Sequence, residues 1–435
     1  MLKNIAFAII FVGSVFGMTA ARAAVAPQDV LTNWYRMTLE LVRHTATYTP
    51  PVASRAFAYL GVTAFEAVAS GSNELNSLAG QLNGLTPPPP REDASIYDEG
   101  VILQAAMSHA VSAFFANTGP TGQRALVSLA TKQRANAADG VASDVVARSE
   151  AYGKAVADHI IAWSLNDGGA VIENMGFPYD YALTDGPAYW VPTNLVRQQQ
   201  FPLLPKWGTN RTFAMPTGTT CPVAPHPDYS EDPTSAFYAE AMEVYEAKAK
   251  MTPDQMHIAR SWSDDPMLST TPPGHWVSIT RQILERDGAP LDVQVEAMAK
   301  LGVGLADAFI GCWDAKYKYN LVRPITYIRR AIDPKWEPLL NTPPFPEYPS
   351  GHSTQSGTAE VILTDLFGDA FAFEDHTMAP DGLKPRSYTS FHEAAEEAGF
   401  SRLYGGIHFR SAIVVGLDQG RRIGAFTVAL KTRSE

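Results

Sequence analysis

The sequence predicts an all-α protein built as two packed helical bundles. Apolar residues recur at three- and four-residue spacing along most of the chain, and no period-two alternation typical of long strands stands out. With 435 residues, the chain is long enough for two domains of ordinary size. Strand is expected only in short pieces.

The first residues have the layout of a secretory signal peptide. Lys3 precedes an apolar run, and Ala21-Arg22-Ala23 forms a small-x-small cleavage site. The run of about 15 residues is short for a membrane anchor, and no later stretch is expected to span a bilayer. We therefore expect residues 1–23 to be removed on export to the periplasm or the medium, leaving a soluble mature chain.

Charge and cysteine content restrict the function further. The net charge is −11 and the acidic residues are spread along the chain, which argues against nucleic acid or a membrane surface as a partner. An oxidising compartment would permit a disulfide between Cys221 and Cys312. Cys312, however, lies in an apolar helical run, where a buried free thiol is more common, so the pairing stays open.

The first half of the chain predicts a four-helix bundle. Helical patterns cover residues 28–46, 54–70, 94–116 and 142–166, which assigns residues 24–170 to an N-terminal bundle. Residues 171–230 are rich in Pro, Gly and aromatic residues and show little helical pattern. We expect them to form a wrapped connecting segment or a boundary.

The second half, residues 231–435, predicts another bundle. Helical patterns at 232–250 and 252–264 each open with an Asp or Thr placed as a cap. Further patterns cover 272–288, 291–320, 353–368 and 406–431. The 291–320 segment is apolar on nearly every side, which is typical of a buried central helix.

The first chemically informative stretch is "CWDAKYKYNLVRP". Lys316 and Arg323 are seven residues apart, or two helical turns, so both are expected on one helix face. Pro324 moves Arg323 out of helical geometry and marks the helix end. Taken alone, these two cations are equally explained as partners of the helix dipole.

The second and third stretches are "PSGH" and "FSRLYGGIHF". Ser350 and Gly351 offer a hydroxyl and an amide donor at a helix start, and His352 beside them can exchange protons near neutral pH. The alternative is a plain helix cap. Arg402 and His408 follow around a Gly-Gly pair. Three cations, two donors and two histidines together suit a tetrahedral oxyanion with two or three charges.

The motifs "K-x6-RP", "PSGH" and "SR-x5-H" resemble the three-part signature of the type 2 phosphatidic acid phosphatase superfamily, which includes the vanadium-dependent haloperoxidases. They span residues 316–408. Trp313 and Phe345 resemble residues of the chloroperoxidase-like members. The segment "SWSDDPMLSTTPPGHW" resembles an upstream segment in which an Asp pairs with the cage arginine, which implies that Asp265 holds Arg402. His275, in the same segment, is a lesser candidate for the active-site entrance.

The resemblance implies a vanadate cofactor, with hydrogen peroxide, a halide and a small organic acceptor as partners; a homo-oligomer is left open. His408 would be the axial vanadium ligand, and His352 the acid–base group. Lys316 would also polarise bound peroxide. The residues that would hydrogen-bond the vanadate oxygens are Lys316, Arg323, Ser350, Gly351 and Arg402.

One position departs from the pattern. Many relatives place an Asp four residues after the last histidine to orient it, but this chain has Ala412, and Asp418 would face elsewhere. A backbone carbonyl is an alternative partner. Because a phosphatase would need His408 as its nucleophile, Ala412 mildly favours the haloperoxidase over an exported acid phosphatase. A binding protein with a relic cage is the third hypothesis.

Overall fold

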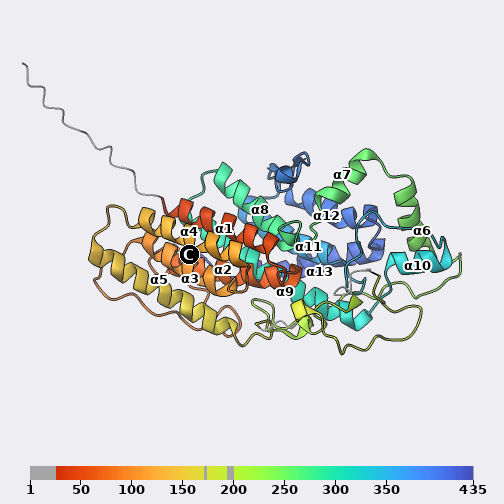
Figure 1. Cartoon of the computed structure of the whole chain (residues 1–435), viewed down its shortest axis with the longest axis horizontal. Coiled ribbons are helices and arrows are strands. Elements are labelled where there is room, and N and C mark those ends of the chain that lie inside the picture. Colours follow the sequence, from red (N-terminus) through yellow and green to blue (C-terminus); the bar gives the residue numbers. More distant parts are fainter. Residues whose placement is uncertain (1–25, 171–173, 194–199, 435) are drawn as a thin grey trace, which may run out of the picture.

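The structure is a computed structural model that describes residues 26–170, 174–193 and 200–434. The molecule is elongated and mostly helical, with strand only in short pieces, as predicted (Figure 1). The predicted signal peptide, residues 1–23, lies outside the described residues, as does part of the connecting segment.

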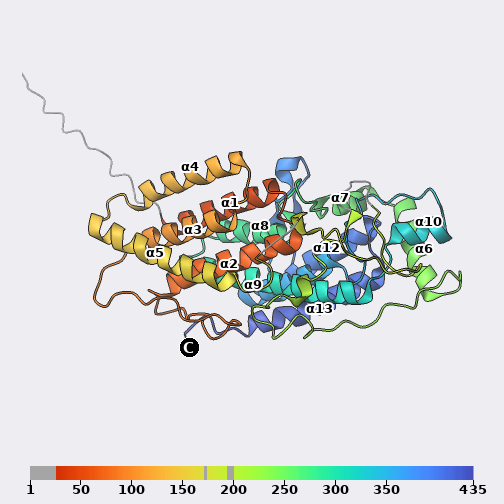
Figure 2. The same ribbon diagram turned by 60° about the horizontal axis from the view of Figure 1, so that its bottom comes forward.

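One end of the molecule is formed by the N-terminal helices (Figures 1 and 2). These are α1 (Pro27–His44), α2 (Pro50–Ala69), α3 (Glu99–Phe114), α4 (Pro120–Ala137) and α5 (Ser143–Ser164). The sequence analysis missed α4, because this surface helix buries few side chains and so shows little apolar periodicity. It also began α3 too early: the Asp98 side chain accepts a hydrogen bond from the Val101 N–H and starts the helix there.

The rest of the chain supplies the other helices and one small hairpin. The helices are α6 (Ala236–Ala249), α7 (Pro253–Ser261), α8 (Thr271–Arg286), α9 (Leu291–Tyr319), α10 (Pro324–Ala331), α11 (Gly351–Phe367), α12 (Phe391–Tyr404) and α13 (Arg410–Val428). Strands β1 (Phe373–Asp375) and β2 (Arg386–Tyr388) pair antiparallel, with Phe373 opposite Tyr388. Short 3-10 turns occur at Asn174–Gly176, Trp207–Thr209 and Ala379–Asp381.

The predicted helix starts were partly right. Thr252 caps α7 and forms a reciprocal capping box with Gln255. Asp232 is not the cap of α6, because Ser235 takes that position and accepts from the Tyr238 N–H. Two helices were missed: α10 is short, and α12 packs small alanines instead of a row of large apolar side chains.

Helix α9 is the buried central helix, as its composition predicted. It packs along α2 so closely that a Cβ added at Gly61 would lie 2.8 Å from the Met298 carbonyl oxygen, and one at Gly302 would lie 2.6 Å from that of Phe57. On its other side α9 contacts α11 and α13. One continuous apolar core therefore joins the two halves of the molecule. Helix α2 is long and apolar enough to cross a membrane, but 94% of its most apolar window is buried in this core.

Asp307 of α9 anchors the connecting segment. Its fully buried carboxylate accepts hydrogen bonds from the backbone N–H groups of Phe213, Ala214 and Met215, at 2.6, 2.8 and 2.8 Å. Burial raises the pKa of Asp307 to about 6, although these three donors oppose the shift.

Replacing Asp307 by Asn is expected to lower the free energy of unfolding by about 3 kcal/mol, because an amide has one acceptor oxygen and its NH2 group faces other donors. Urea denaturation would measure the change. The control is Asp418→Asn, which removes an exposed pair with Arg422 and should cost less than about 0.5 kcal/mol. Equal losses in the two variants would contradict the anchoring role.

Both cysteines, Cys221 and Cys312, are buried free thiols. The Cys312 Sγ lies 3.9 Å from the Pro349 carbonyl oxygen, inside the apolar surroundings that its helix predicted.

Candidate active site

The three predicted stretches meet at a cavity of about 330 Å³. Its wall includes Gly351, His352, Arg402 and His408 from the C-terminal half. The N-terminal half and the connecting segment also contribute, through Thr49, Pro50, Met175, Phe177 and Leu203. The predicted site residues thus lie in the C-terminal half, but the cavity is completed by the rest of the chain.

Three cations are buried around this cavity. Lys316 and Arg323 have no exposed surface, and Arg402 is 3% exposed. Among the described residues, no carboxylate lies within ion-pair distance of any of them. Burial lowers the pKa of each cation, that of Lys316 to about 7. Such a group of unpaired charges is stabilised when an anion binds among them.

The route by which Arg323 reaches the cavity differs from the prediction. Helix α9 ends at Tyr319, and Asn320 takes the left-handed conformation with φ 48°. Arg323 is therefore not on the helix face of Lys316, but in an extended conformation (φ −77°, ψ 152°) just before α10. The expectation that Pro324 excludes Arg323 from a helix is confirmed.

Backbone carbonyl groups hold the two side chains in place. The Lys316 ammonium donates to the carbonyl oxygens of Pro346, Glu347 and Pro349, at 3.0, 3.1 and 2.5 Å. Arg323 donates through Nε to Phe345 and through Nη1 to Ile407, both at 2.9 Å. Its Nη2 is buried without a partner in the described chain, as is the Nε of Arg402. Buried donors normally have acceptors, so these atoms indicate a ligand.

Ser350 and Gly351 form the start of α11. Ser350 does cap the helix, since its Oγ accepts from the Ser353 N–H at 3.3 Å, so the capping interpretation is correct for this residue. Gly351 leaves a small cradle: a Cβ added there would sit in van der Waals contact with Trp313, at 3.6 Å, and with Lys316, at 3.9 Å. The side chain of any other residue would take up this space.

His408 is oriented by a residue that the sequence analysis missed. Its Nδ1 lies 2.9 Å from Oε1 of Glu347, which also accepts from the Phe409 N–H at 2.9 Å. The expected backbone carbonyl is thus not the partner of Nδ1. Burial raises the pKa of Glu347 to about 8, but Oε1 already accepts from the Phe409 N–H and so acts as an acceptor toward Nδ1 too. Nδ1 of His408 then carries the proton and the Nε2 lone pair faces the cage, 3.1 Å from Arg323 Nη1. Burial lowers the pKa of His408, and the cage cations lower it further.

Glu347 also removes the argument drawn from Ala412. Asp418 pairs with Arg422 on the helix surface, as expected. His408 nevertheless has a carboxylate partner, so the absent Asp does not distinguish a metal ligand from a nucleophile. The sequence does show an acidic residue, Glu347, in the loop just before "PSGH". Its spacing from the other motifs, however, does not tell which side chain Glu347 contacts.

Replacing Glu347 by Leu is expected to weaken vanadate binding about 10- to 100-fold, because the ring of His408 loses its orienting acceptor. Glu347→Gln keeps an acceptor oxygen and should lose less. Equilibrium dialysis against vanadate would measure both variants. Glu66→Leu is the matched control, since this buried carboxylate accepts from Ser77 and Leu78 and should affect stability only.

The acidic residues near His352 also differ from expectation. Asp265 forms no ion pair with Arg402 among the described residues; Arg402 Nη1 instead donates to the Trp262 carbonyl oxygen at 2.5 Å. Burial lowers the pKa of Arg402, and the charges of Asp265 and Asp264 oppose this at longer range. Asp264, the preceding residue, has its Oδ2 at 3.4 Å from His352 Nε2.

Aromatic rings form the apolar wall of the cavity. The ring centroids of Trp313 and Phe345 are 4.9 Å apart, and Phe309 lies 5.5 Å from Trp313. The Lys316 ammonium is 5.0 Å from the Phe345 centroid. Trp313, Phe345 and Lys316 therefore lie next to one another. A weakly hydrated anion loses less solvation at such an apolar surface than a strongly hydrated one.

Taken together, the fold and the site define an all-α protein with a buried group of three cations beside a cavity of about 330 Å³. Residues 296–434 match the family model described as the VCPO second helical-bundle domain. The crystal structure described as the first bacterial vanadium-dependent iodoperoxidase is 38% identical, with a TM-score of 0.85 over 94% of this chain and 97% of that chain. The chain belongs to the vanadium-dependent haloperoxidases.

Two further relatives agree with this. Vanadium chloroperoxidase from Curvularia inaequalis is 33% identical over 133 residues, or 25% of this chain. The matched region spans only 22% of that curated relative. A holo-type bacterial vanadium-dependent chloroperoxidase has a TM-score of 0.66 and 16% identity, covering 94% of this chain and 93% of its own, and so shares the fold.

Proposed function

We propose that the protein oxidises a halide with hydrogen peroxide to hypohalous acid, using vanadate held in the cage. The observation that carries this proposal is the set of three buried cations with no carboxylate at ion-pair distance among the described residues. An anion with two or three charges would match this set. Membership of the family supports vanadate as that anion.

The residues present fit the cofactor. Arg323 Nη2 and Arg402 Nε are buried donors without a partner in the described chain, and Gly351 has no side chain to fill the small cradle beside Trp313 and Lys316. Nε2 of His408 would bind the vanadium. The residues that would hold the oxygens are Lys316, Arg323, Ser350, Gly351 and Arg402. When bound, vanadate supplies a Lewis acid that activates peroxide toward attack by a halide.

His352 would move the protons. Burial lowers its pKa to about 4, and the charge of Arg402 acts in the same direction. The ring is therefore neutral at pH 7, so it would take up a proton from hydrogen peroxide and give that proton to the leaving hydroxide, which departs as water. With Nε2 facing Asp264, the other ring nitrogen is the atom available as the base.

Iodide is the halide that we propose. The 38% identity with a protein described as an iodoperoxidase supports it. The apolar wall formed by Phe309, Trp313 and Phe345 supports it on physical grounds, because iodide is weakly hydrated and loses less solvation than chloride at such a surface. A small organic acceptor would then take the halogen outside the cage.

The test measures vanadate-dependent oxidation of iodide, bromide and chloride by the purified protein, together with hydrolysis of a chromogenic phosphate ester. We expect oxidation of iodide that excess phosphate inhibits. Ester hydrolysis inhibited by vanadate, without halide oxidation, would instead assign the protein to the acid phosphatases. Binding of neither oxyanion would favour the relic cage.

We also propose export with cleavage near Ala23, based on the charged, apolar and small-residue order of the first residues. Mass spectrometry of the protein from the periplasm and the medium of an expressing bacterium would give its N-terminus. A cytoplasmic protein that keeps residues 1–23 would contradict export.

A further inference from the structure

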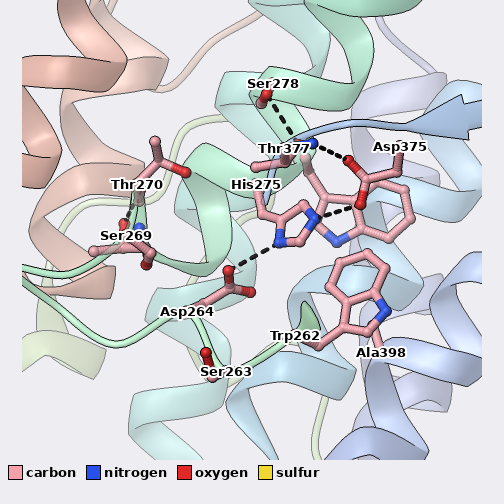
Figure 3. A network of polar contacts seen from close by, with 12 residues as sticks. Trp262, Ser263, Asp264, Ser269, Thr270, His275, Ser278, Asp375, Thr377 and Ala398 are labelled. Carbon is pink, nitrogen blue, oxygen red and sulfur yellow. Dashed lines mark hydrogen bonds and ion pairs between the residues drawn. The ribbon is translucent and has the colours of Figure 1, made fainter. Parts of the chain in front are cut away.

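Asp264, His275 and Asp375 form a buried row of acidic and imidazole groups (Figure 3). Asp264, at one end of this row, lies 3.4 Å from His352. Nδ1 of His275 lies 2.8 Å from Asp264 Oδ1, and its Nε2 lies 2.7 Å from Asp375 Oδ2. His275 has no exposed surface, and the two aspartates are 2% and 5% exposed. His275 therefore lies behind Asp264, not at the entrance where the sequence analysis placed it.

The geometry requires a charged ring at His275. A neutral imidazole has one N–H group and would turn a lone pair toward one of the two carboxylates, whereas an imidazolium donates to both. Burial lowers the pKa of His275, but Asp264 and Asp375 outweigh it and raise the pKa to about 10. The ring also stacks on Trp262, with centroids 4.2 Å apart and planes 18° apart, which suits a cation.

The far end of the row is fixed by the hairpin. Asp375 is the last residue of β1, and its Oδ1 accepts from the Thr377 N–H at 2.8 Å. The Thr377 hydroxyl in turn lies 3.0 Å from that of Ser278 on α8, the helix that carries His275 (Figure 3). The one described hairpin thus holds Asp375 against this helix.

The near end of the row is a strained loop. Asp264, Met267 and Thr271 have φ values of 51°, 67° and 64°, in the left-handed region that non-glycine residues rarely adopt. Such a residue persists only where its surroundings enforce its conformation. The hydrogen bond from His275 fixes the carboxylate of Asp264 in this conformation.

We propose that His275 and Asp375 are positioning residues, which keep Asp264 ionised and aimed at His352. This inference rests on the proposed function. Asp264 Oδ2 and His352 Nε2 are 3.4 Å apart, at ion-pair distance, and neither atom makes a hydrogen bond in the described chain. Asp264 therefore keeps the proton of His352 on Nε2 and leaves the other ring nitrogen free as the base.

The surrounding charges explain why the row needs a cation. The groups that act on His352 are Asp264 from the loop, His275 from α8 and Arg402 from α12. Asp375 also faces Tyr388 of β2. Without the imidazolium, two carboxylates would be buried together, and one of them would take up a proton. If Asp264 did so, it would no longer hold the Nε2 proton of His352.

The first test compares kcat in three variants. His275→Gln and Asp375→Leu should each lower kcat at least about tenfold. This is part of the roughly 100- to 10,000-fold by which general acid–base catalysis typically raises a rate. Asp375→Asn keeps an acceptor for His275 and should stay within about threefold of the parent at pH 6. Binding of phosphate to the vanadate-free protein should change less than about threefold in all of them, because no cage residue is altered.

The pH profile separates positioning from a merely structural role. Asp375→Asn removes a charge that raises the pKa of His275, so the ring loses its proton at lower pH than in the parent. The alkaline limb of kcat should therefore move to lower pH. Asp167→Asn is the matched control, because this buried carboxylate binds Arg55 and Tyr59 instead; it should lower stability without moving the limb.

The second test uses the vanadate-free protein, so it does not depend on halide oxidation. Nitrogen NMR of 15N-histidine-labelled protein should show two N–H groups on His275 at pH 8, and His352 protonated on Nε2. In His275→Gln, which leaves both carboxylates without a cation, His352 should show mixed tautomers. A neutral His275 in the parent, or an unchanged His352 in the variant, would overturn the proposal. Absence of halide oxidation with the expected spectra would overturn the proposed function alone.

Discussion

Replacing His408 by Ala abolishes tight binding of vanadate and all vanadate-dependent oxidation, if the proposed ligand is correct. The variant removes the lone pair at Nε2, which Glu347 directs into the cage by holding the proton on Nδ1. Loss of this bond should exceed the roughly 100-fold typical of losing a residue that merely orients a ligand. Equilibrium dialysis with orthovanadate gives the affinity directly.

The matching control is His109→Ala. His109 pairs with Asp158 in the N-terminal half and lines no part of the cavity. The His109→Ala variant should bind vanadate as tightly as the parent protein. Binding of phosphate to His408→Ala provides a second comparison, because phosphate is held by hydrogen bonds alone and needs no bond from His408 to a metal. A His408→Ala variant that binds vanadate as tightly as the parent would rule out this ligand.

Replacing His352 by Ala is expected to lower kcat about 100- to 10,000-fold while vanadate stays bound. His352 lines the cavity with a neutral ring, whereas the anion is held by the three cations and by His408. The loss should therefore fall on turnover and change vanadate affinity by less than about tenfold. The two histidines would thus be separated by experiment, one acting in binding and the other in proton transfer.

Steady-state kinetics at saturating vanadate would make this measurement, with dialysis to confirm occupancy. Asp264→Asn should give a smaller loss than His352→Ala, since it leaves the base in place and removes only its charged partner. An active His352→Ala enzyme would show that another group moves the protons.

Much of the fold follows from local sequence. The period of apolar residues predicted α2, α9 and α11, because a helix that packs on several sides must be apolar along most of its length. Helices α4, α10 and α12 were not predicted. Helix α4 lies on the surface, α10 is short and α12 is rich in alanine. Each therefore shows only a weak pattern of apolar residues, although its backbone is as regular as that of the predicted helices.

The sequence by itself also identified the residues of the cage. Lysine, arginine, serine, glycine and histidine in three spaced motifs predicted an oxyanion site, because the cations supply charge while the serine hydroxyl and the glycine amide supply hydrogen-bond donors. Local rules decided two of their positions: Ser350 caps α11, and Pro324 excludes Arg323 from a helix.

Only the tertiary structure decided which carboxylate serves which partner. Asp264 and Asp265 are adjacent, but the left-handed backbone at Asp264 directs its side chain to His275 and His352. Glu347, in a proline-rich loop, reaches His408 across 61 residues of sequence, and Asp375 reaches His275 across 100. A hydrogen bond depends on distances of a few tenths of an ångström between such remote segments. Spacing along the chain cannot set those distances; the packing of the helices around α9 does.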